Sequence, residues 1–462
     1  MSKNKAGNNG KLHFIGIGGA GMSCLAHVFL DLGYEVSGSD IKESANTRAL
    51  TKTGASVRIG HDPANLKGAG TVIVSSAIRP DNPELIAAKK AGLPVLQRAE
   101  LLDKLMRRKR GIAIAGTHGK TTTTSMAAVM MEFCGLEPTY LIGGELNDIG
   151  SGAKYGAGEF LVAEADESDA SLLKYAPEIA VVTNIEADHL DFYGSLDEIK
   201  DVFREFLNRL PKNGFAIVCL DSQALTEIMP DLKCRIKTYS IQGEADFRAT
   251  GIRQEKTGSS FEVVVDGSKQ GRVRISSPGR HNVANALAVM ALGLSIGLPF
   301  KDAAAGVKAF TGVRRRFQIK GVAKQITVVD DYAHHPSEIA ATLEAARTGQ
   351  WRRVVTIFQP HRYSRTKFLH EEFGRVFGAA DEVIITDVYG AGEEPEPGVD
   401  GKLIVDSILE EEPYKMVAYF PKKGDAGDYI AGRLGAGDIL LTMGAGDIWA
   451  LGEEVLEEIK TR

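Results

Sequence analysis

The sequence is poor in cysteine and has no long apolar run, and both absences narrow the classes of protein to which it can belong. Its four cysteines have no C-x-x-C spacing, so neither a disulfide framework nor a zinc site is indicated. Each lies within or beside an apolar stretch, which predicts buried thiols at Cys24, Cys134, Cys219 and Cys234. No segment approaches the ~20 apolar residues of a membrane helix, and the polar amino-terminal segment contains no apolar signal-peptide region. We therefore expect a cytoplasmic protein with no membrane partner.

The sequence also lacks a strong net charge. Its formal charge is -5 at pH 7, with 55 Lys and Arg against 60 Asp and Glu, so it has no general electrostatic attraction for nucleic acid. The basic run 107–110 follows a predicted helix at 99–106, and the helix dipole stabilises cations at that end. We interpret this run as a solvated helix end and expect no nucleic-acid partner.

Glycine, by contrast, is abundant. Many of the 51 glycines stand beside short apolar runs, which is typical of strand-to-helix turns in α/β proteins. The 462 residues exceed one domain of ~100–200 residues, and the alternation of short strands and helices, which predicts doubly wound parallel sheets, restarts twice. We therefore predict an α/β protein of three domains, 1–106, 107–312 and 313–462, with a β-rich insertion at 245–276.

A glycine-containing turn between a predicted strand and a predicted helix indicates a triphosphate-binding loop. In such a loop backbone N–H groups and the helix N-terminus hold the phosphates, the lysine supplies positive charge, and the following hydroxyl reaches Mg²⁺. Because Ile114 replaces the first glycine of the G-x-x-x-x-G-K-[ST] pattern, an ordinary glycine turn with a surface lysine remains an alternative. The loop residues are Gly116, Thr117, His118, Gly119, Lys120, Thr121 and Thr122.

Acidic residues follow the next two predicted strands. Glu164 ends the first of these strands, residues 165–169 add three more acids, and the second strand runs into three acids and a histidine at 186–191. The carboxyl ends of strands are where α/β sheets bind ligands, and Mg²⁺ prefers oxygen ligands. We therefore predict that an acid of the first group coordinates a metal, and we interpret Glu167 and Asp169 as solvated charges.

The first domain carries a second glycine motif. Gly16-Ile17-Gly18-Gly19-Ala20-Gly21 matches G-x-G-x-x-G after a strand, and Asp40 ends the next strand. Alone, this motif indicates a dinucleotide-binding dehydrogenase. Glycines allow a backbone to approach any diphosphate, however, so a UDP-linked compound fits the loop as well. A nicotinamide enzyme would leave the loop at 116–122 unexplained, which makes the dehydrogenase the poorer interpretation.

Together these segments resemble the Mur ligases of bacterial cell-wall synthesis, and the resemblance covers essentially the whole chain from about Lys11 onward. It implies a Rossmann-like UDP-sugar domain, a central P-loop-type ATPase domain that carries the β-rich insertion, and a Rossmann-like carboxyl-terminal domain for an amino acid. Five further stretches carry the resemblance, at 277–285, 312–317, 330–336, 358–366 and 389–395.

The resemblance also implies a reaction. In such ligases a substrate carboxylate attacks the γ-phosphate of ATP to give an acyl phosphate, and the amine of an amino acid then displaces phosphate. The resemblance is strongest to the member that joins L-alanine to the lactyl carboxylate of UDP-N-acetylmuramate. A carboxylate that meets a triphosphate needs neutralised charge and correct positioning more than a protein nucleophile. We therefore expect an ATP- and Mg²⁺-dependent ligase of peptidoglycan-precursor synthesis, acting as a monomer or weak homodimer.

Roles for individual residues follow from the same resemblance. Lys120 neutralises phosphate charge, Thr121 and Glu164 bind one Mg²⁺, and His189 binds a second. The role of His189 comes from the resemblance alone, because Mg²⁺ prefers oxygen ligands. The other implied contacts are His281 and Asn282 with adenine, Arg316 and Asp331 with the ATP phosphates and ribose, and Gly18, Gly19, Ala20, Gly21 and Asp40 with the UDP-sugar.

The implied amino-acid site consists of His361, Arg362 and Arg365. Two arginines suit the bidentate capture of a free α-carboxylate. Selection of alanine then depends on a small pocket, and pockets discriminate a single methylene weakly. The arginines that precede Arg316, at 314 and 315, are interpreted as solvent-exposed charge.

One family feature is not expected in this chain. Several Mur ligases carry a carbamylated lysine a short distance beyond the metal-binding histidine, but here that neighbourhood is Phe203-Arg204 and Lys200 lies too early. We predict no carbamylated lysine and place Lys200 on a helix surface. The sequence identifies no base for the incoming amine.

Four alternatives remain. A recycling enzyme of the same fold joins a tripeptide to the same UDP-sugar, but its relatives lack the His-Arg-Tyr-Ser-Arg-Thr stretch at 361–366. The front glycine loop argues against folate polyglutamylation, and a dehydrogenase leaves Lys120 and Thr121 unexplained. A non-catalytic nucleotide-binding module need not keep Glu164, His189 and the arginine pair together.

Overall fold

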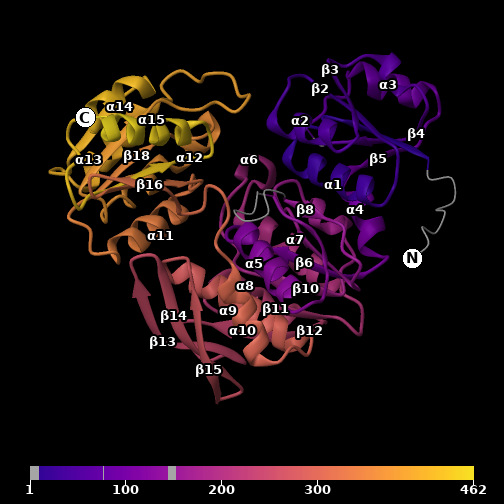
Figure 1. Ribbon diagram of the computed structural model, residues 1–462, viewed down its shortest axis with the longest axis horizontal. Helices are drawn as coiled ribbons and strands as arrows, with labels where there is room; N and C mark the ends of the chain where they lie inside the picture. Colours follow the sequence, from indigo (N-terminus) through magenta and orange to yellow (C-terminus); the bar gives the residue numbers. More distant parts are fainter. Residues whose placement is uncertain (1–9, 76, 144–151, 462) are drawn as a thin grey trace. The chain divides into compact units, whose positions relative to one another are not determined.

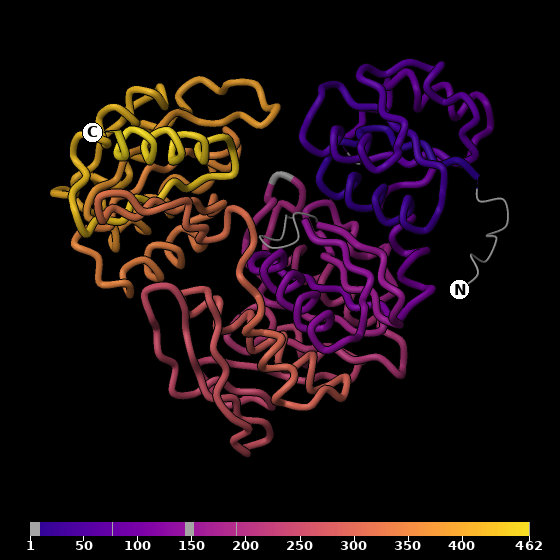
Figure 2. Tube along the Cα trace, viewed as in Figure 1, coloured from indigo at the N-terminus to yellow at the C-terminus, as the bar shows by residue number. Residues whose placement is uncertain are grey.

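The computed structural model describes residues 10–75, 77–143 and 152–461; Figure 1 shows its helices and strands and Figure 2 the path of the chain. The described residues form three sheets. The chain divides into two compact units, one running to Arg248 with Val265–Ser268 and Leu287–Phe310, the other comprising Ala249–Val264, Lys269–Ala286 and Thr311–Arg462. The domain borders at residues 106 and 312 remain a prediction.

The first sheet has the order β3-β2-β1-β4-β5, and every pairing in it is parallel. The order reverses between β1 and β4, so the loop that follows β1 lies at the topological switch point, where open α/β sheets bind ligands. The strands are β1 Lys11–Ile15, β2 Val36–Asp40, β3 Ser56–Ile59, β4 Ala69–Val74 and β5 Val95–Gln97. The helices are α1 Ala20–Asp31, α2 Ala45–Lys52, η1 Pro63–Leu66, α3 Pro83–Lys90 and α4 Arg98–Met106.

The second sheet has ten strands in the order β15-β14-β13-β12-β11-β10-β6-β9-β7-β8. The predicted β-rich insertion corresponds to β13, β14 and β15, and β13 joins the sheet through its parallel pairing with β12. The strands are β6 Arg110–Ala115, β7 Thr139–Leu141, β8 Ala153–Lys154, β9 Phe160–Glu164, β10 Ile179–Val182, β11 Phe215–Cys219, β12 Arg235–Ser240, β13 Phe247–Glu255, β14 Gly258–Val265 and β15 Ser268–Ile275. The helices are α5 Lys120–Phe133, η2 Ser171–Lys174, α6 Leu190–Tyr193, α7 Leu196–Asn208, α8 Gln223–Ile228, η3 Met229–Asp231, α9 Arg280–Ser295 and α10 Phe300–Ala309.

The third sheet has the order β16-β17-β21-β18-β19-β20, parallel except for the β16–β17 pair. Side chains alternate between its two faces: Val354 and Phe358 of β18 belong to one buried cluster, Val355 and Ile357 to another. Both faces are therefore covered, as a doubly wound sheet requires. The strands are β16 Gln318–Ala323, β17 Ile326–Asp331, β18 Val354–Phe358, β19 Glu382–Thr386, β20 Val417–Phe420 and β21 Ile439–Met443. The helices are α11 Pro336–Arg347, α12 Tyr363–Gly374, α13 Gly401–Glu411, α14 Lys423–Ala431 and α15 Ile448–Thr461.

The prediction of buried thiols is correct for one cysteine only. Cys219 is buried in β11, whereas the other three are partly exposed, and none of the four forms a disulfide in the described part of the chain. Apolar neighbours in the sequence do not determine which side of an element faces the core. Cys24, for example, lies among apolar residues of α1 but is only partly buried, and its Sγ lies 3.4 Å from the Ile142 carbonyl oxygen. In the part of the chain that the structure describes, no helix has the length and apolar character needed to cross a membrane.

Candidate active site

The loop predicted to bind phosphate, referred to below as the phosphate loop, lies between β6 and α5, in the predicted order of strand, loop and helix. Gly116 and Gly119 have φ values of 130° and 82°, which residues with side chains rarely adopt. A Cβ atom on Gly116 would lie 2.1 Å from the hydroxyl of Thr183. The backbone N–H of His118 donates to the amide oxygen of Asn184 at 2.9 Å, and the Thr183 hydroxyl donates to the His118 carbonyl at 2.6 Å. The segment after β10 therefore fixes the shape of the loop.

The ammonium of Lys120 is held by three acceptors. It donates to the carbonyls of Gly116 at 2.7 Å and Thr117 at 3.1 Å and to Glu167 Oε1 at 2.8 Å. An ammonium has three N–H donors, so these contacts satisfy all of them. Burial opposes the charge, but the carboxylates of Glu167 and Asp166 raise the pKa of Lys120 above its ordinary value. The group is therefore a largely buried cation within the loop that is predicted to bind phosphate.

Glu167 contradicts the interpretation of this residue as a solvated charge, since its side chain is only 2% exposed. Burial and the neighbouring Asp166 raise the pKa of Glu167 to about 7, although Lys120 opposes the shift. The turn after β9 folds inward because Tyr193 donates to the Glu167 carbonyl and accepts from the N–H of Ala170 at 3.1 Å. A buried loop lysine needs a counter-charge, and that requirement is the signal that could have identified Glu167.

Asp169, the other residue interpreted as a solvated charge, is partly exposed. Its carboxylate accepts the backbone N–H of Ser171 at 3.0 Å. It is therefore engaged in a local turn and is not simply hydrated.

The predicted metal ligands lie at strand ends next to the phosphate loop. β6 pairs with β9 on one side and with β10 on the other, so Glu164 and the segment leading to His189 flank the loop at one edge of the sheet. Glu164 Oε1 accepts the N–H of Gly143 at 2.8 Å. His189 has a left-handed backbone, with φ at 54°, and its Nε2 lies 3.7 Å from Asp188 Oδ2. The hydroxyl of Thr121 and the Glu164 carboxylate are oxygen donors of the kind that Mg²⁺ prefers.

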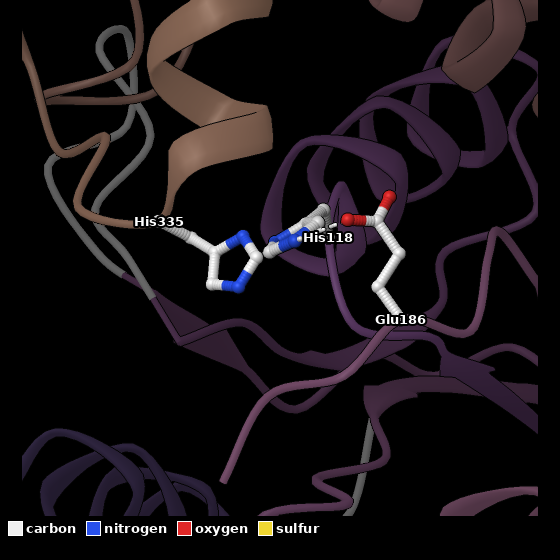
Figure 3. A group of neighbouring side chains, drawn as sticks. All are labelled: His118, Glu186 and His335. Carbon is white, nitrogen blue, oxygen red and sulfur yellow. Dashed lines mark ion pairs between the residues drawn. The ribbon is translucent and has the colours of Figure 1, made fainter. Parts of the chain in front are cut away.

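A histidine of the loop also meets a glutamate of the segment after β10. His118 Nε2 lies 3.4 Å from Glu186 Oε2, and Figure 3 shows the imidazole directed at the carboxylate. The Thr117 hydroxyl accepts the backbone N–H of Glu186 at 2.9 Å. The segment after β10 thus carries ionisable side chains to the loop as well as shaping it.

In the first sheet, the front glycine loop is tied to the end of β2. The N–H of Gly18 donates to Asp40 Oδ2 at 2.8 Å, and a Cβ atom on Gly18 would lie 2.9 Å from that oxygen. The N–H groups of Gly16 and Ile17 donate to the Ser39 carbonyl at 2.8 and 3.0 Å. Asp40 therefore shapes the loop, and its predicted contact with the substrate remains a prediction.

A buried polar network, which the sequence did not reveal, lies beneath this loop. Glu84 is fully buried; its Oε2 lies 3.3 Å from His13 Nε2 and 3.6 Å from His61 Nδ1, and it accepts from the Ser39 hydroxyl. Its Oε1 accepts from the Asn65 amide at 2.6 Å. These hydrogen bonds lower the pKa of Glu84 to about 2, against the opposing effect of burial. The network supports Ser39, whose carbonyl holds the glycine loop.

The predicted adenosine-site residues belong to α9, the segment before β16, and β17. The Asp331 carboxylate accepts the N–H groups of Phe317 at 2.7 Å and Ala333 at 2.8 Å, and burial raises its pKa to about 6 although Arg316 opposes the shift. Arg316 Nη1 lies 3.4 Å from Glu338 Oε1. The remaining two residues begin α9: His281 is exposed, and the buried Asn282 donates to the Pro278 carbonyl at 2.7 Å.

Arg315 corrects the interpretation of residues 314 and 315 as solvent-exposed charge. Arg314 is exposed, but Arg315 Nε lies 3.1 Å from the buried carboxylate of Asp330 and its Nη2 donates to the Gly444 carbonyl at 2.6 Å. The basic run gave no signal of this pairing because Asp330 and Gly444 are distant in the sequence. Arg315 therefore anchors the segment on which Arg316 stands.

The predicted amino-acid-site residues lie together after β18. Arg365 Nη1 is 3.3 Å from His361 Nδ1, and the His361 ring stacks on Tyr389 with centroids 5.8 Å apart. Burial, then His334 and the arginines, lowers the pKa of His361 to about 3, so its imidazole is neutral near physiological pH. Arg362 has φ at 70° and directly precedes α12. The site thus presents two guanidinium groups beside an uncharged ring.

Lys200 lies on α7, where it forms ion pairs with Asp197 at 3.0 Å and Glu227 at 2.7 Å. Its side chain is 16% exposed, so the predicted place on the helix surface holds only in part. That no lysine is carbamylated remains a prediction.

Comparison with known proteins gives consistent results along the chain. Three family models match in order: "Mur ligase family, catalytic domain" at residues 11–110, "Mur ligase middle domain" at 114–293, and "Mur ligase, glutamate ligase domain" at 315–446. The chain is similar to the UDP-N-acetylmuramate–L-alanine ligase of Geotalea uraniireducens, with 50% identity over 97% of this chain and 98% of that one.

Solved structures agree. The crystal structure of the UDP-N-acetylmuramate–alanine ligase of Thermotoga maritima matches with a TM-score of 0.83 and 29% identity, covering 98% of this chain and 99% of that one. A murein peptide ligase from Psychrobacter arcticus matches with a TM-score of 0.72 and 26% identity over 98% and 99% of the two chains.

Proposed function

Because the chain belongs to the Mur ligase family, we propose that it joins L-alanine to the lactyl carboxylate of UDP-N-acetylmuramate while ATP is converted to ADP and phosphate. The observation that carries this proposal is the 50% identity with an alanine ligase over 97% of the chain. We further propose that the reaction belongs to peptidoglycan-precursor synthesis in the cytoplasm and that the enzyme is a monomer or weak homodimer.

The phosphate loop supplies the charge that this reaction needs. A sugar-linked carboxylate and a triphosphate repel each other, and the Lys120 cation within the loop supports the assignment of phosphate binding to residues 116–122. Thr121, Glu164 and His189 would hold Mg²⁺, which when bound neutralises phosphate charge. His281, Asn282, Arg316 and Asp331 are proposed to bind the rest of ATP.

The two substrates are assigned to the other loops. Gly18, Gly19, Ala20, Gly21 and Asp40 are proposed to bind the UDP-sugar, since backbone N–H groups at the start of α1 suit a diphosphate. His361, Arg362 and Arg365 are proposed to bind alanine, whose α-carboxylate fits a pair of guanidinium groups. The proposed borders between the three domains lie at 106/107 and 312/313.

Phosphate release measured with UDP-N-acetylmuramate, ATP, Mg²⁺ and each common amino acid in turn tests the proposal. Alanine is expected to give the highest kcat/KM, with glycine and serine lower but detectable, because a pocket discriminates one methylene by only ~10–200-fold. Release only with a tripeptide would assign the chain to the recycling activity. Oxidation of NADPH, or phosphate release that needs no amino acid, would also contradict the proposal.

A further inference from the structure

The backbone of Arg362 is held in a conformation that residues with side chains avoid. Its φ is 70° and its ψ 137°, outside the regions that L-residues populate freely. Such a backbone persists only when surrounding contacts hold it, and it is found most often at functional sites. The direction of the Arg362 side chain therefore depends on whatever fixes the start of α12.

Hydrogen bonds on both sides of Arg362 supply part of this restraint. Its N–H donates to the Tyr389 carbonyl at 2.9 Å. Its carbonyl accepts from Thr366, from the backbone N–H at 3.1 Å and from the hydroxyl at 2.9 Å. The bonds from Thr366 close the first turn of α12, but the N–H groups of that turn need an acceptor outside the helix, which another group supplies.

That group is Glu393. Its Oε2 accepts the backbone N–H of Ser364 at 3.0 Å and its Oε1 accepts the Ser364 hydroxyl at 2.7 Å. A carboxylate at this position satisfies N-terminal donors of the helix and complements its dipole. The same Oε1 lies 4.0 Å from Arg362 Nη1, so one side chain holds both the helix start and the guanidinium.

Glu393 is itself fixed to the strand ends that carry the site. Its N–H donates to the Gly390 carbonyl at 3.0 Å, and the N–H of Tyr389 donates to the Pro360 carbonyl at 2.9 Å. Tyr389 also forms an isolated parallel bridge with His361. The loop 389–393 is therefore joined to the segment 360–364 at several points, and Glu393 is the side chain that connects it to α12.

We propose that Glu393 is a positioning residue for the amino-acid substrate: by holding the first turn of α12 it keeps Arg362 in the orientation that meets the substrate carboxylate. This inference rests on the proposed function, because it takes an α-amino acid as the ligand of Arg362 and Arg365. Without Glu393, Ser364 loses two hydrogen bonds, and Arg362 can relax to an ordinary backbone conformation that turns its guanidinium away.

The test compares Glu393→Ala, Glu393→Gln and the control Glu394→Ala by steady-state phosphate release, with the full chain and each substrate varied in turn. Glu394 is the adjacent glutamate and is exposed. We expect Glu393→Ala to raise the KM for alanine roughly tenfold or more, while the KM values for ATP and UDP-N-acetylmuramate stay within about twofold. Glu393→Gln, which keeps one acceptor, should give an intermediate KM for alanine, and Glu394→Ala should match the wild type.

Two results would overturn the inference. One is an unchanged KM for alanine in both Glu393 variants; the other is a parallel rise in all three KM values, which indicates general loss of structure. If Glu393→Ala does not fold, Glu393→Gln decides by the same criterion. If the wild-type chain releases no phosphate with alanine, the proposed function is contradicted, and this inference with it. Because that result comes from the wild type alone, it is distinguished from a failure of the Glu393 variants.

Discussion

Lys120→Ala is expected to reduce phosphate release to below about one thousandth of the wild-type rate while UDP-N-acetylmuramate binds with unchanged affinity. The rate falls because the cation within the phosphate loop is lost, and removing one charge-stabilising donor from such a site costs about 10²–10³ in rate even when the donor is neutral. UDP-sugar binding persists because the front glycine loop belongs to a different sheet, the one built on β1 and β2. Discontinuous assays of released phosphate measure the rate, and calorimetric titration with UDP-N-acetylmuramate measures the binding affinity.

The same variant is expected to lose stability in a pH-dependent way. Glu167 would remain buried without its cation, which raises the folded-state pKa of this carboxyl further above 4.5. A carboxyl whose pKa is raised by folding favours the folded state below its unfolded value and loses that contribution as pH rises through the folded pKa. Lys120→Ala should therefore be more destabilised at pH 8 than at pH 5.

A double variant separates the two roles of Lys120. Adding Glu167→Gln to Lys120→Ala removes the buried charge, so thermal stability should recover while phosphate release stays absent. Recovery of activity in the double variant, or loss of UDP-sugar binding in the single one, would contradict the assignment of Lys120 to phosphate binding.

Glu84→Gln is expected to lower the free energy of unfolding of the first sheet by about 3 kcal/mol, because it removes the charge from a buried hydrogen-bonded network. The Glu84 carboxylate accepts from Ser39, Asn65 and the N–H of Asp62. A glutamine would turn an NH₂ group toward at least one of these donors. Chemical denaturation of the wild type and of Glu84→Gln, with unfolding followed by circular dichroism, measures the change in the free energy of unfolding.

The contribution of Glu84 also has a defined pH range. Its pKa is lowered from 4.5 to about 2, so the stabilisation is fully present above pH 4.5 and is lost as pH falls toward 2. The wild type should therefore lose about 3 kcal/mol over that range that Glu84→Gln does not lose. Glu43→Gln is the matched control, because the exposed Glu43–Arg48 pair contributes little. Equal destabilisation of both variants would show that the buried network has no special role.

The loops and strands could be predicted from the sequence because their signals are local. Gly116 and Gly119 are needed where the backbone has positive φ, and the strand before them and the helix after them show in the apolar pattern itself. The β-rich insertion is visible for the same reason. Periodicity and turn chemistry act over a few residues, so a single sequence determines them.

The partners of the ionisable residues were decided only by the tertiary structure. Glu167 lies 47 residues from Lys120, Glu84 lies 71 from His13, and Glu393 lies 29 from Ser364. In each case a carboxylate that the sequence presents as one charge among many becomes specific because parallel strands and their connections bring distant segments to one sheet edge. The sequence by itself determined the order of strands, loops and helices and the types of side chain available at each loop. Which of them are buried, which are paired and which can titrate depends on long-range packing, and only the folded chain establishes it.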